Sequence, residues 1–302
     1  MKIVFMGTPD FAVASLDALK NAGFDIVGVV TAADKPAGRG QKLSESAVKK
    51  YAVQHGLKVL QPLKLKDPAF IEELKALNAD LQVVVAFRML PEIVWNMPAK
   101  GTINLHGSLL PQYRGAAPIN HAIINGEKES GVTTFFLKQE IDTGDVIFSE
   151  STPITEDDTA GTLHDKLMNI GARLIVKTVK AIENGNYQEI PQPMDKVLKM
   201  APKIFKDFCE VNWHQDNQMV FNHIRGLSPY PTAFTFLNDK TLKIFQAAKE
   251  ETFPKIAAGD FETDGKTFLK FASNNGYIKL LEVQLEGKKR MSIDEFLRGI
   301  RL

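Results

Sequence analysis

Apolar residues in the first half of the chain follow two spacings. Short apolar runs, typical of buried strands, alternate with longer segments in which apolar residues recur at the helical spacing. The runs predict strands at 2–6, 25–31, 58–60, 81–87, 102–105, 132–137 and 146–148, and the helical spacing predicts helices at 11–19, 44–55, 68–77 and 159–184. Strands that alternate with helices form a mostly parallel sheet with helices on both faces. We therefore expect an α/β, Rossmann-like fold with ligand sites beyond the carboxyl ends of its strands.

The pattern changes after residue 205. Short strands with alternating apolar and polar residues are predicted at 232–237, 241–247, 267–272 and 277–284, after a helix at 218–226. Asp264-Gly265 and Asn275-Gly276 are hairpin-turn signals between them. Many short strands are typical of a small β-barrel of the OB-like type. Because prolines punctuate the stretch between the two patterns, we expect a first domain at 1–188, a linker at 189–205 and a second domain at 206–302.

Charge and composition narrow the classes of function. The chain carries 37 basic and 36 acidic residues, a net charge of +1, so any contact with nucleic acid must be local. A single cysteine, Cys209, excludes an internal disulfide framework. No window has the roughly 18 consecutive apolar residues of a membrane span, and the first apolar run turns polar at Thr8, before a signal peptide is complete. We expect a cytoplasmic protein that makes no membrane contact.

Two kinds of cofactor find no support in the sequence. The six histidines form no spaced ligand motif such as H-E-x-x-H, so we expect no metal ion. The first strand ends in Gly7-Thr8-Pro9 rather than in the G-x-G-x-x-G that lets a backbone approach a pyrophosphate. We therefore expect no nicotinamide cofactor either.

The candidate chemistry follows the predicted strand at 102–105. Alternate strand residues face the same way, so Asn104 and His106 project together toward one side of the strand end. An asparagine amide and a protonated imidazole both donate hydrogen bonds to an oxygen on which negative charge develops. The alternative is purely structural, because a histidine is often a satisfied core side chain and an asparagine often forms a turn.

Five segments carry a resemblance to a known family. They are NLHGSLLPQYRGAAP at 104–118, QEIDTGDVI at 139–147, MGTPDFA at 6–12, DKPAGRGQKL at 34–43 and IRGLSPYP at 224–231. Together they resemble the folate-dependent formyltransferases along nearly the whole chain. The resemblance implies that Asp142 completes a catalytic set with Asn104 and His106, and Asp145 is its local competitor for that role. In this set Asp142 would hold the imidazole charged and oriented, and position a water that carries a proton.

The resemblance also implies the substrates. The donor would be 10-formyltetrahydrofolate, whose formyl carbon an amine attacks directly through a tetrahedral intermediate. The favoured acceptor is the amino group of the methionyl residue on initiator tRNA. Alternatives are a small amine acceptor, either an amino-sugar nucleotide or glycinamide ribonucleotide, and a tRNA-binding module without activity. The implied folate contacts are Phe87, Arg88, Met89, Leu90, Ser108, Leu109, Leu110, Pro111, Gln139, Glu140 and Ile141.

The tRNA contacts implied by the resemblance lie in the basic loop at 34–43. Arg39 and Lys42 would contact the tRNA there, and the second domain would also bind RNA. The cluster Lys288-Lys289-Arg290 is either a further RNA contact or a solvated face. We expect a monomer.

Overall fold

The computed structural model describes residues 1–37, 42–193 and 197–300, and the chain forms two compact units. Unit 1 comprises 1–114, 131–152 and 165–199, and unit 2 comprises 115–130, 153–164 and 200–302. The chain passes between the units more than once, so each unit is assembled from segments that are distant in the sequence.

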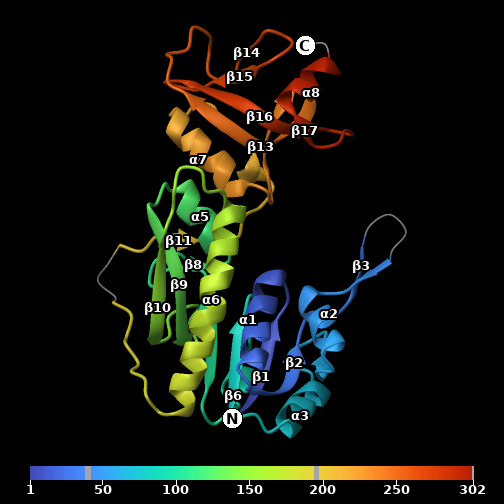
Figure 1. Ribbon diagram of the computed structural model, residues 1–302, viewed down its shortest axis with the longest axis vertical. Coiled ribbons are helices and arrows are strands. Elements are labelled where there is room, and N and C mark those ends of the chain that lie inside the picture. Colours follow the sequence, from blue (N-terminus) through green and yellow to red (C-terminus); the bar gives the residue numbers. More distant parts are fainter. Residues whose placement is uncertain (38–41, 194–196, 301–302) are drawn as a thin grey trace. The chain divides into compact units, whose positions relative to one another are not determined.

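Unit 1 is built on a seven-stranded sheet of order β10-β9-β7-β6-β1-β2-β5 (Figure 1). Its strands are β1 (Lys2–Gly7), β2 (Asp25–Val30), β5 (Val59–Leu60), β6 (Leu81–Val85), β7 (Thr102–His106), β9 (Glu129–Phe136) and β10 (Val146–Pro153). The five strands β5, β2, β1, β6 and β7 pair in parallel, whereas β9 pairs antiparallel with β7. The predicted mostly parallel, Rossmann-like sheet is confirmed.

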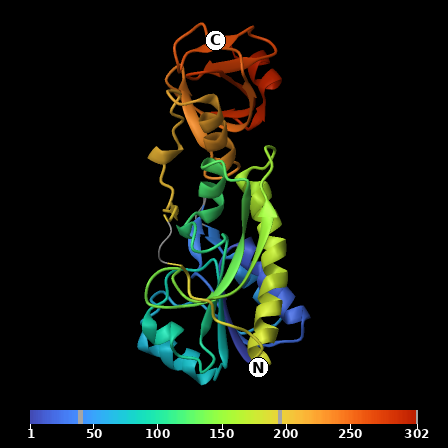
Figure 2. The same ribbon diagram turned by 90° about the vertical axis from the view of Figure 1, so that its left-hand side faces the viewer.

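Helices cover both faces of this sheet. They are α1 (Asp10–Asn21), α2 (Ala47–Gln54), α3 (Pro68–Ala76), α4 (Glu92–Trp95) and α6 (Ala160–Glu183). On one face, alternate residues of β1 pack with Phe70 and Leu74 of α3 in an apolar cluster. On the other face, α6 approaches β7 so closely that a Cβ added at Gly171 would lie 2.7 Å from the Leu105 side chain. Figures 1 and 2 both show α6 alongside β9, to which Thr178 and Thr134 tie it with a 2.9 Å hydrogen bond.

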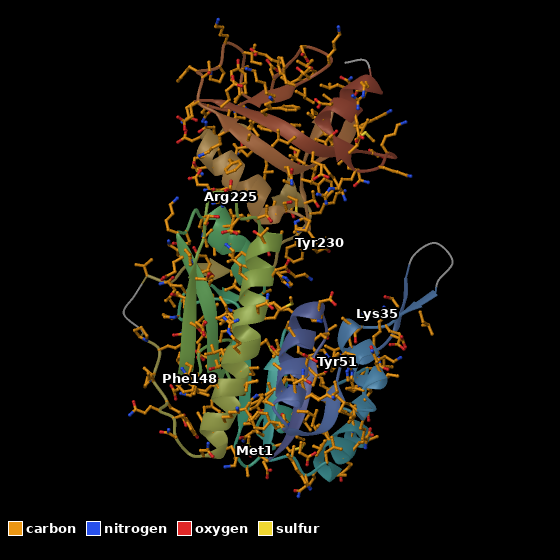
Figure 3. All side chains as sticks on the ribbon, viewed as in Figure 1. Met1, Lys35, Tyr51, Phe148, Arg225 and Tyr230 are labelled. Carbon is orange, nitrogen blue, oxygen red and sulfur yellow. The ribbon has the colours of Figure 1, made fainter. Side chains whose placement is uncertain are left out.

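Local sequence signals explain where the helices begin. The Ser46 hydroxyl accepts a hydrogen bond from the amide of Lys49 and caps α2, and the Asp67 carboxylate does the same for α3, whose first residue is Pro68. A side-chain hydrogen bond joins two neighbouring helices, since the Tyr51 hydroxyl of α2 donates to Asp17 of α1 over 2.7 Å. Tyr51 is labelled on α2 in Figure 3.

The segment between β2 and α2 is predicted to be a loop, but two short strands form in it. Residues Lys35–Ala37 form β3 and residues Lys42–Ser44 form β4, and the two pair antiparallel. The loop was predicted from the glycine and basic residues at its centre, and strands of only three residues give too short a pattern to be predicted beside them. Arg39 lies outside the described residues, and only the backbone of Lys42 is described.

The carboxyl edge of the parallel sheet is held tightly together. β1 ends at Gly7, where an added Cβ would lie 2.6 Å from the Ala12 Cβ and 3.0 Å from the Val85 carbonyl oxygen. Only glycine lets the end of β1 approach both α1 and β6 in this way. This edge is where β6 and β7 present the residues that the sequence predicts to be functional.

Unit 2 holds a curled antiparallel sheet of order β12-β13-β16-β15-β14, with β17 paired to β16. Its strands are β12 (Ala233–Leu237), β13 (Lys240–Glu250), β14 (Phe261–Thr263), β15 (Leu269–Ala272), β16 (Tyr277–Leu285) and β17 (Met291–Ser292). In the described residues no pairing joins β14 to β12, so the sheet is a half-barrel. The predicted antiparallel second domain is confirmed, including its hairpins at Asp264-Gly265 and Asn275-Gly276.

The core of unit 2 lies between this sheet and helix α7 (Asn217–Leu227), which packs against β13 and β16. The remaining elements are β8 (Arg114–Gly115), α5 (Pro118–Ile124), β11 (Met200–Ala201), the 3₁₀ helix η1 (Asp207–Cys209) and α8 (Ile293–Arg298). A capping box between Ser292 and Glu295 begins α8. None of the helices in the described part of the chain is both long and apolar enough to span a bilayer.

Candidate active site

His106 is the last residue of β7, and its imidazole is almost completely buried, with a side-chain exposure of 8%. Its Nε2 lies 2.9 Å from the backbone carbonyl oxygen of Tyr113. A carbonyl oxygen only accepts hydrogen bonds, so Nε2 carries a hydrogen and Nδ1 is the atom that can gain or lose a proton. The histidine therefore presents one defined nitrogen to its surroundings.

Asp142 faces that nitrogen. Its Oδ2 lies 3.8 Å from Nδ1 of His106, and its side chain is 10% exposed. This distance exceeds that of a direct hydrogen bond, and it is short enough for the carboxylate to stabilise a positive charge on the ring. Asp142 has a φ of 56°, in the left-handed region that few residues other than glycine adopt and that aspartate tolerates better than most. The loop between β9 and β10 thus holds the carboxylate in an uncommon backbone conformation.

Asn104 lies two residues before His106 on β7, so strand alternation places both on the same face of the sheet. It is paired in register with Val84 of β6 and Phe135 of β9, and it is partly buried. Its side-chain amide makes no hydrogen bond to another residue in the described ranges. The two amide hydrogens are therefore available to a ligand.

The two aspartates of the QEIDTGDVI segment have different partners. Asp142 faces His106, whereas Asp145 forms a 2.7 Å ion pair with the half-exposed Lys138. The geometry therefore associates Asp142, and not its competitor, with the histidine.

The segment after β7 uses several of its polar groups to hold itself in place. The Ser108 hydroxyl is buried and donates to the carbonyl of Gln112, while the Thr133 hydroxyl of β9 donates to the carbonyl of Ser108 and accepts from the amide of Leu110. Pro111 is buried and Leu109 is partly exposed. Of the folate contacts predicted here, the side chain of Ser108 and the amide of Leu110 already have protein partners.

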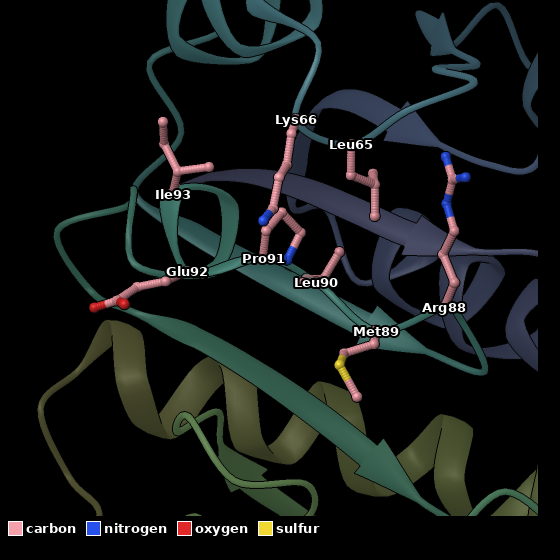
Figure 4. Close-up of a pocket in the computed structure, with 8 residues that line it drawn as sticks. All are labelled: Leu65, Lys66, Arg88, Met89, Leu90, Pro91, Glu92 and Ile93. Carbon is pink, nitrogen blue, oxygen red and sulfur yellow. The ribbon is translucent and has the colours of Figure 1, made fainter.

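The segment after β6 lines an open pocket of about 650 Å³ (Figure 4). The lining residues are Leu65, Lys66, Arg88, Met89, Leu90, Pro91, Glu92 and Ile93. Leu90 is buried, whereas Met89 is 71% exposed and Ile93 is 57% exposed. Three of the lining residues, Arg88, Met89 and Leu90, are among those that the sequence predicts to contact folate.

Arg88 has an internal role in this region. Its guanidinium donates to the backbone carbonyls of Pro62 and Leu63 and lies 5.7 Å from the centre of the Phe87 ring. Arg88 therefore ties the segment after β6 to the segment after β5, and its charge is directed at protein carbonyls. This contact explains the arginine without a substrate.

The third predicted folate segment precedes Asp142. Gln139, Glu140 and Ile141 are all exposed, and Ile141 is a large apolar residue with 57% of its surface exposed. The Thr143 hydroxyl donates to the carbonyl of Glu140 over 3.0 Å and shapes this turn.

The sequence did not predict the group that accepts a hydrogen bond from Nε2 of His106, the backbone carbonyl of Tyr113. The Tyr113 carbonyl is a backbone group, so no pattern of side chains marks it, and its position depends on the turn that follows β7.

In unit 2, the basic cluster at 288–290 is partly neutralised, since Arg290 pairs with Glu282 and lies 4.2 Å from the centre of the Phe245 ring. In the described residues no group of three or more histidine, cysteine, aspartate or glutamate side chains is placed to hold a metal ion.

Comparison with known proteins defines the class. Residues 1–179 match the sequence profile of the formyl transferase family, and residues 203–301 match that of the formyl transferase C-terminal domain. The chain belongs to the formyl transferase family. Among solved structures, it is similar in fold to an N-formyltransferase from Helicobacter canadensis crystallised with folinic acid and dTDP-3-aminofucose, at a TM-score of 0.70 and 23% identity over 94% of this chain and 99% of that one.

Curated relatives narrow the similarity to particular enzymes. The chain is 53% identical to the methionyl-tRNA formyltransferase of Bacteroides fragilis, over 100% of this chain and 96% of the relative. It is 54% identical to that of Parabacteroides distasonis over 100% and 96%, and 53% identical to that of Flavobacterium johnsoniae over 99% and 96%. These relatives match over both units, so the similarity is not restricted to the domain that holds His106.

Proposed function

We propose that this protein transfers the formyl group of 10-formyltetrahydrofolate to the free amino group of the methionyl residue on initiator tRNA, for translation initiation. The observation that carries the proposal is the pair formed by His106 Nδ1 and Asp142 Oδ2, 3.8 Å apart at the carboxyl end of β7, with Asn104 on the same strand face. The identity of more than half to methionyl-tRNA formyltransferases over the full chain supports this acceptor.

The three side chains suit the charges that develop in this reaction. The amine nitrogen attacks the formyl carbon and forms a C–N bond, and the carbonyl oxygen becomes negative in the tetrahedral intermediate. The amide of Asn104 and a proton on Nδ1 of His106 donate to that oxygen. Nε2 of His106 is already committed to the Tyr113 carbonyl, so the ring turns its other nitrogen to the substrate.

Proton movement completes the step. When the bond between the formyl carbon and N10 of the folate breaks, the attacking amine has lost a proton and N10 has gained one. Asp142 holds the positive charge on His106 in place, and its carboxylate can pass this proton directly or through one water. Each role requires the carboxylate to stay beside the ring.

The donor site suits a folate in chemical character. Apolar side chains of Met89 and Ile141, both largely exposed in the protein alone, would be covered by an aromatic pterin and its linked ring. Backbone groups of 87–90 and 139–141 would read the pterin edge. The pocket beside Met89 also carries the cation of Lys66, which suits the carboxylate of the folate tail.

The acceptor contacts complete the proposal. We place Arg39 and Lys42 against the tRNA, because in a chain of net charge +1 RNA contact must come from local clusters. We assign the catalytic and folate sites to 1–188, a linker to 189–205 and further RNA contacts to 206–302. The enzyme would act in the cytoplasm, because charged tRNA is consumed there. It would act as a monomer and would need neither a metal ion nor a nicotinamide cofactor.

One assay tests the function and its alternatives together. The protein is incubated with 10-formyltetrahydrofolate and, in separate reactions, charged initiator tRNA, charged elongator tRNA, glycinamide ribonucleotide, an amino-sugar nucleotide or buffer. Formyl-methionine on initiator tRNA alone is the expected result. Transfer only to a small amine, release of formate in every reaction, or tRNA binding without transfer would each overturn the proposal.

A further inference from the structure

Gln192 lies in the segment after α6, and its side chain makes four hydrogen bonds although it is only 7% exposed. Its Oε1 accepts from Nε and Nη2 of Arg114, over 3.1 and 2.6 Å. Its Nε2 donates to the backbone carbonyls of Asp142 and Gly144, each over 2.8 Å. A carboxamide has two acceptor and two donor positions, so the side chain of Gln192 is fully used.

The partners fix the orientation of this carboxamide. The Arg114 guanidinium has only donors, and the carbonyls of Asp142 and Gly144 have only acceptor oxygens. A flipped amide would face donors with its own NH₂ group and carbonyl oxygens with its own oxygen. Arg114, itself 8% exposed, therefore holds Gln192 in the single orientation that can bind the Asp142 loop.

That loop requires such support from outside. Asp142 has a φ of 56°, and two residues later Gly144 lies so close to β9 that an added Cβ would be 1.6 Å from the Phe136 carbonyl oxygen. A non-glycine residue in the left-handed region costs on the order of 1 kcal/mol and persists where surrounding contacts determine it. Gln192 binds the carbonyls on both sides of Thr143, and so holds the turn that carries the carboxylate.

The other end of the contact reaches the histidine. Arg114 directly follows Tyr113, whose carbonyl accepts the hydrogen of His106 Nε2. The pair Arg114 and Gln192 thus joins the backbone that orients the imidazole to the backbone that carries Asp142. These hydrogen bonds therefore fix the separation of 3.8 Å between Nδ1 of His106 and Oδ2 of Asp142.

We propose that Gln192 is a positioning residue for Asp142 in formyl transfer, and that Arg114 orients it. Gln192 binds only backbone carbonyls and Arg114, and it acts through the carboxylate of Asp142. This inference rests on the proposed function, because it assumes that Asp142 takes part in the reaction.

The sharpest test is Gln192→Glu. The glutamate has nearly the same size and still accepts from Arg114, but it turns an oxygen toward the two carbonyls where Gln192 donates. A misplacement of about 1 Å can lower a rate about a hundredfold, so we expect kcat to fall roughly 10- to 100-fold while KM for both substrates changes less than about threefold. A kcat within about twofold of the unsubstituted enzyme would overturn the inference.

A matched control separates positioning from the cost of a buried carboxyl group. Gln82 on β6 is 1% exposed and accepts a 3.1 Å hydrogen bond from Thr102, at the start of β7. Gln82→Glu is the same substitution on the strand next to β7, beside the end of β7 that is farthest from His106, and we expect it to lower the unfolding midpoint without changing kcat. An equal loss of kcat in both variants would show a general structural effect and refute positioning. If Gln192→Glu does not fold, Arg114→Lys serves instead, since lysine keeps the charge and loses the forked contact.

A double-mutant cycle distinguishes failure of the inference from failure of the proposed function. If Gln192 acts through Asp142, then Gln192→Glu lowers kcat in the native background and has little further effect beside Asp142→Asn. Independent losses that multiply would refute the inference and leave the function standing. Full activity of Asp142→Asn would instead refute the catalytic assignment on which the inference rests.

Discussion

Two buried histidine environments in this protein differ in what faces the ring. In unit 1, His106 has the Asp142 carboxylate 3.8 Å from Nδ1. In unit 2, His121 and His223 both contact the ring of Phe208, with centroids 5.7 and 5.4 Å apart, and no carboxylate of the described residues lies within ion-pair distance of either histidine. The Phe208 ring and a backbone carbonyl lie beside each of these two histidines, whereas a carboxylate faces His106.

The consequence appears in their protonation. Burial lowers the pKa of His121, and it lowers the pKa of His223 to about 4, against a weaker opposing effect of the Cys209 carbonyl. The buried Nε2 of His223 has no hydrogen-bond partner in the described residues. Burial without a facing charge therefore favours the neutral form of His121 and His223, whereas a carboxylate faces the ring of His106.

The largest effect on the rate is expected when the charge of Asp142, which distinguishes the environment of His106, is removed. Asp142→Asn keeps the size of the side chain and the carbonyl that Gln192 binds, so we expect a loss of about 10³-fold in kcat, within the range for acid–base groups. Single-turnover formyl transfer under saturating substrates measures it. Asp145→Asn, which removes only the pair with half-exposed Lys138, is the control and should stay within about threefold. Equal losses in both variants would contradict the distinction.

Removing the amide of Asn104 tests the oxyanion contact beside the pair. We expect Asn104→Ala to lower kcat about a hundredfold, close to 3 kcal/mol of transition-state stabilisation, with a smaller change in KM. Steady-state kinetics with each substrate varied in turn measure both constants. A large rise in KM at constant kcat would assign Asn104 to ground-state binding instead.

The neutral histidine of unit 2 predicts an effect on stability rather than on rate. Its pKa is about 6.5 in the unfolded chain and about 4 in the fold, so the unfolded state binds more protons between these values. The contribution of His223 is complete above pH 6.5 and decreases as the pH falls toward 4, by about 3 kcal/mol in all. Urea unfolding at pH 7, 5.5 and 4 measures the loss. His223→Gln should weaken this pH dependence, and an unchanged slope would contradict the assignment.

The smallest effect is expected for a cation assigned to binding. Arg39→Ala should raise KM for the tRNA about fivefold, equivalent to about 1 kcal/mol, and leave KM for the folate and kcat unchanged. The salt dependence of KM for the tRNA should decrease in parallel. Unchanged tRNA kinetics would remove Arg39 from the acceptor site and leave the histidine comparison intact.

Much of the fold could be predicted because its signals are local. Alternation along β7 predicted that Asn104 and His106 share a face, and apolar runs predicted the parallel strands with small errors at their ends. The errors fall where a signal is short. The three-residue strands β3 and β4 were read as a loop, and α8, which a capping box begins, was not predicted.

The supporting contacts of the candidate site could not be predicted in this way. Gln192 lies 78 residues from Arg114 and 50 from Asp142, and neither periodicity nor motif spacing links residues so far apart. The segment around Gln192 contains prolines and is predicted to be a linker, and in it Ile190 pairs with Val146 as an isolated bridge. A single buried glutamine among prolines carries no sequence signal of the four bonds it makes.

The hydrogen bond from His106 to the carbonyl of Tyr113 has a consequence for how this enzyme can vary. Every amino acid supplies that oxygen, so exchanging the residue at position 113 removes the buried phenol ring and leaves the acceptor in the chain. An alanine scan would therefore record packing there and overlook orientation of the imidazole. No amino-acid substitution at position 113 removes this oxygen, so the hydrogen bond is lost only when the backbone moves.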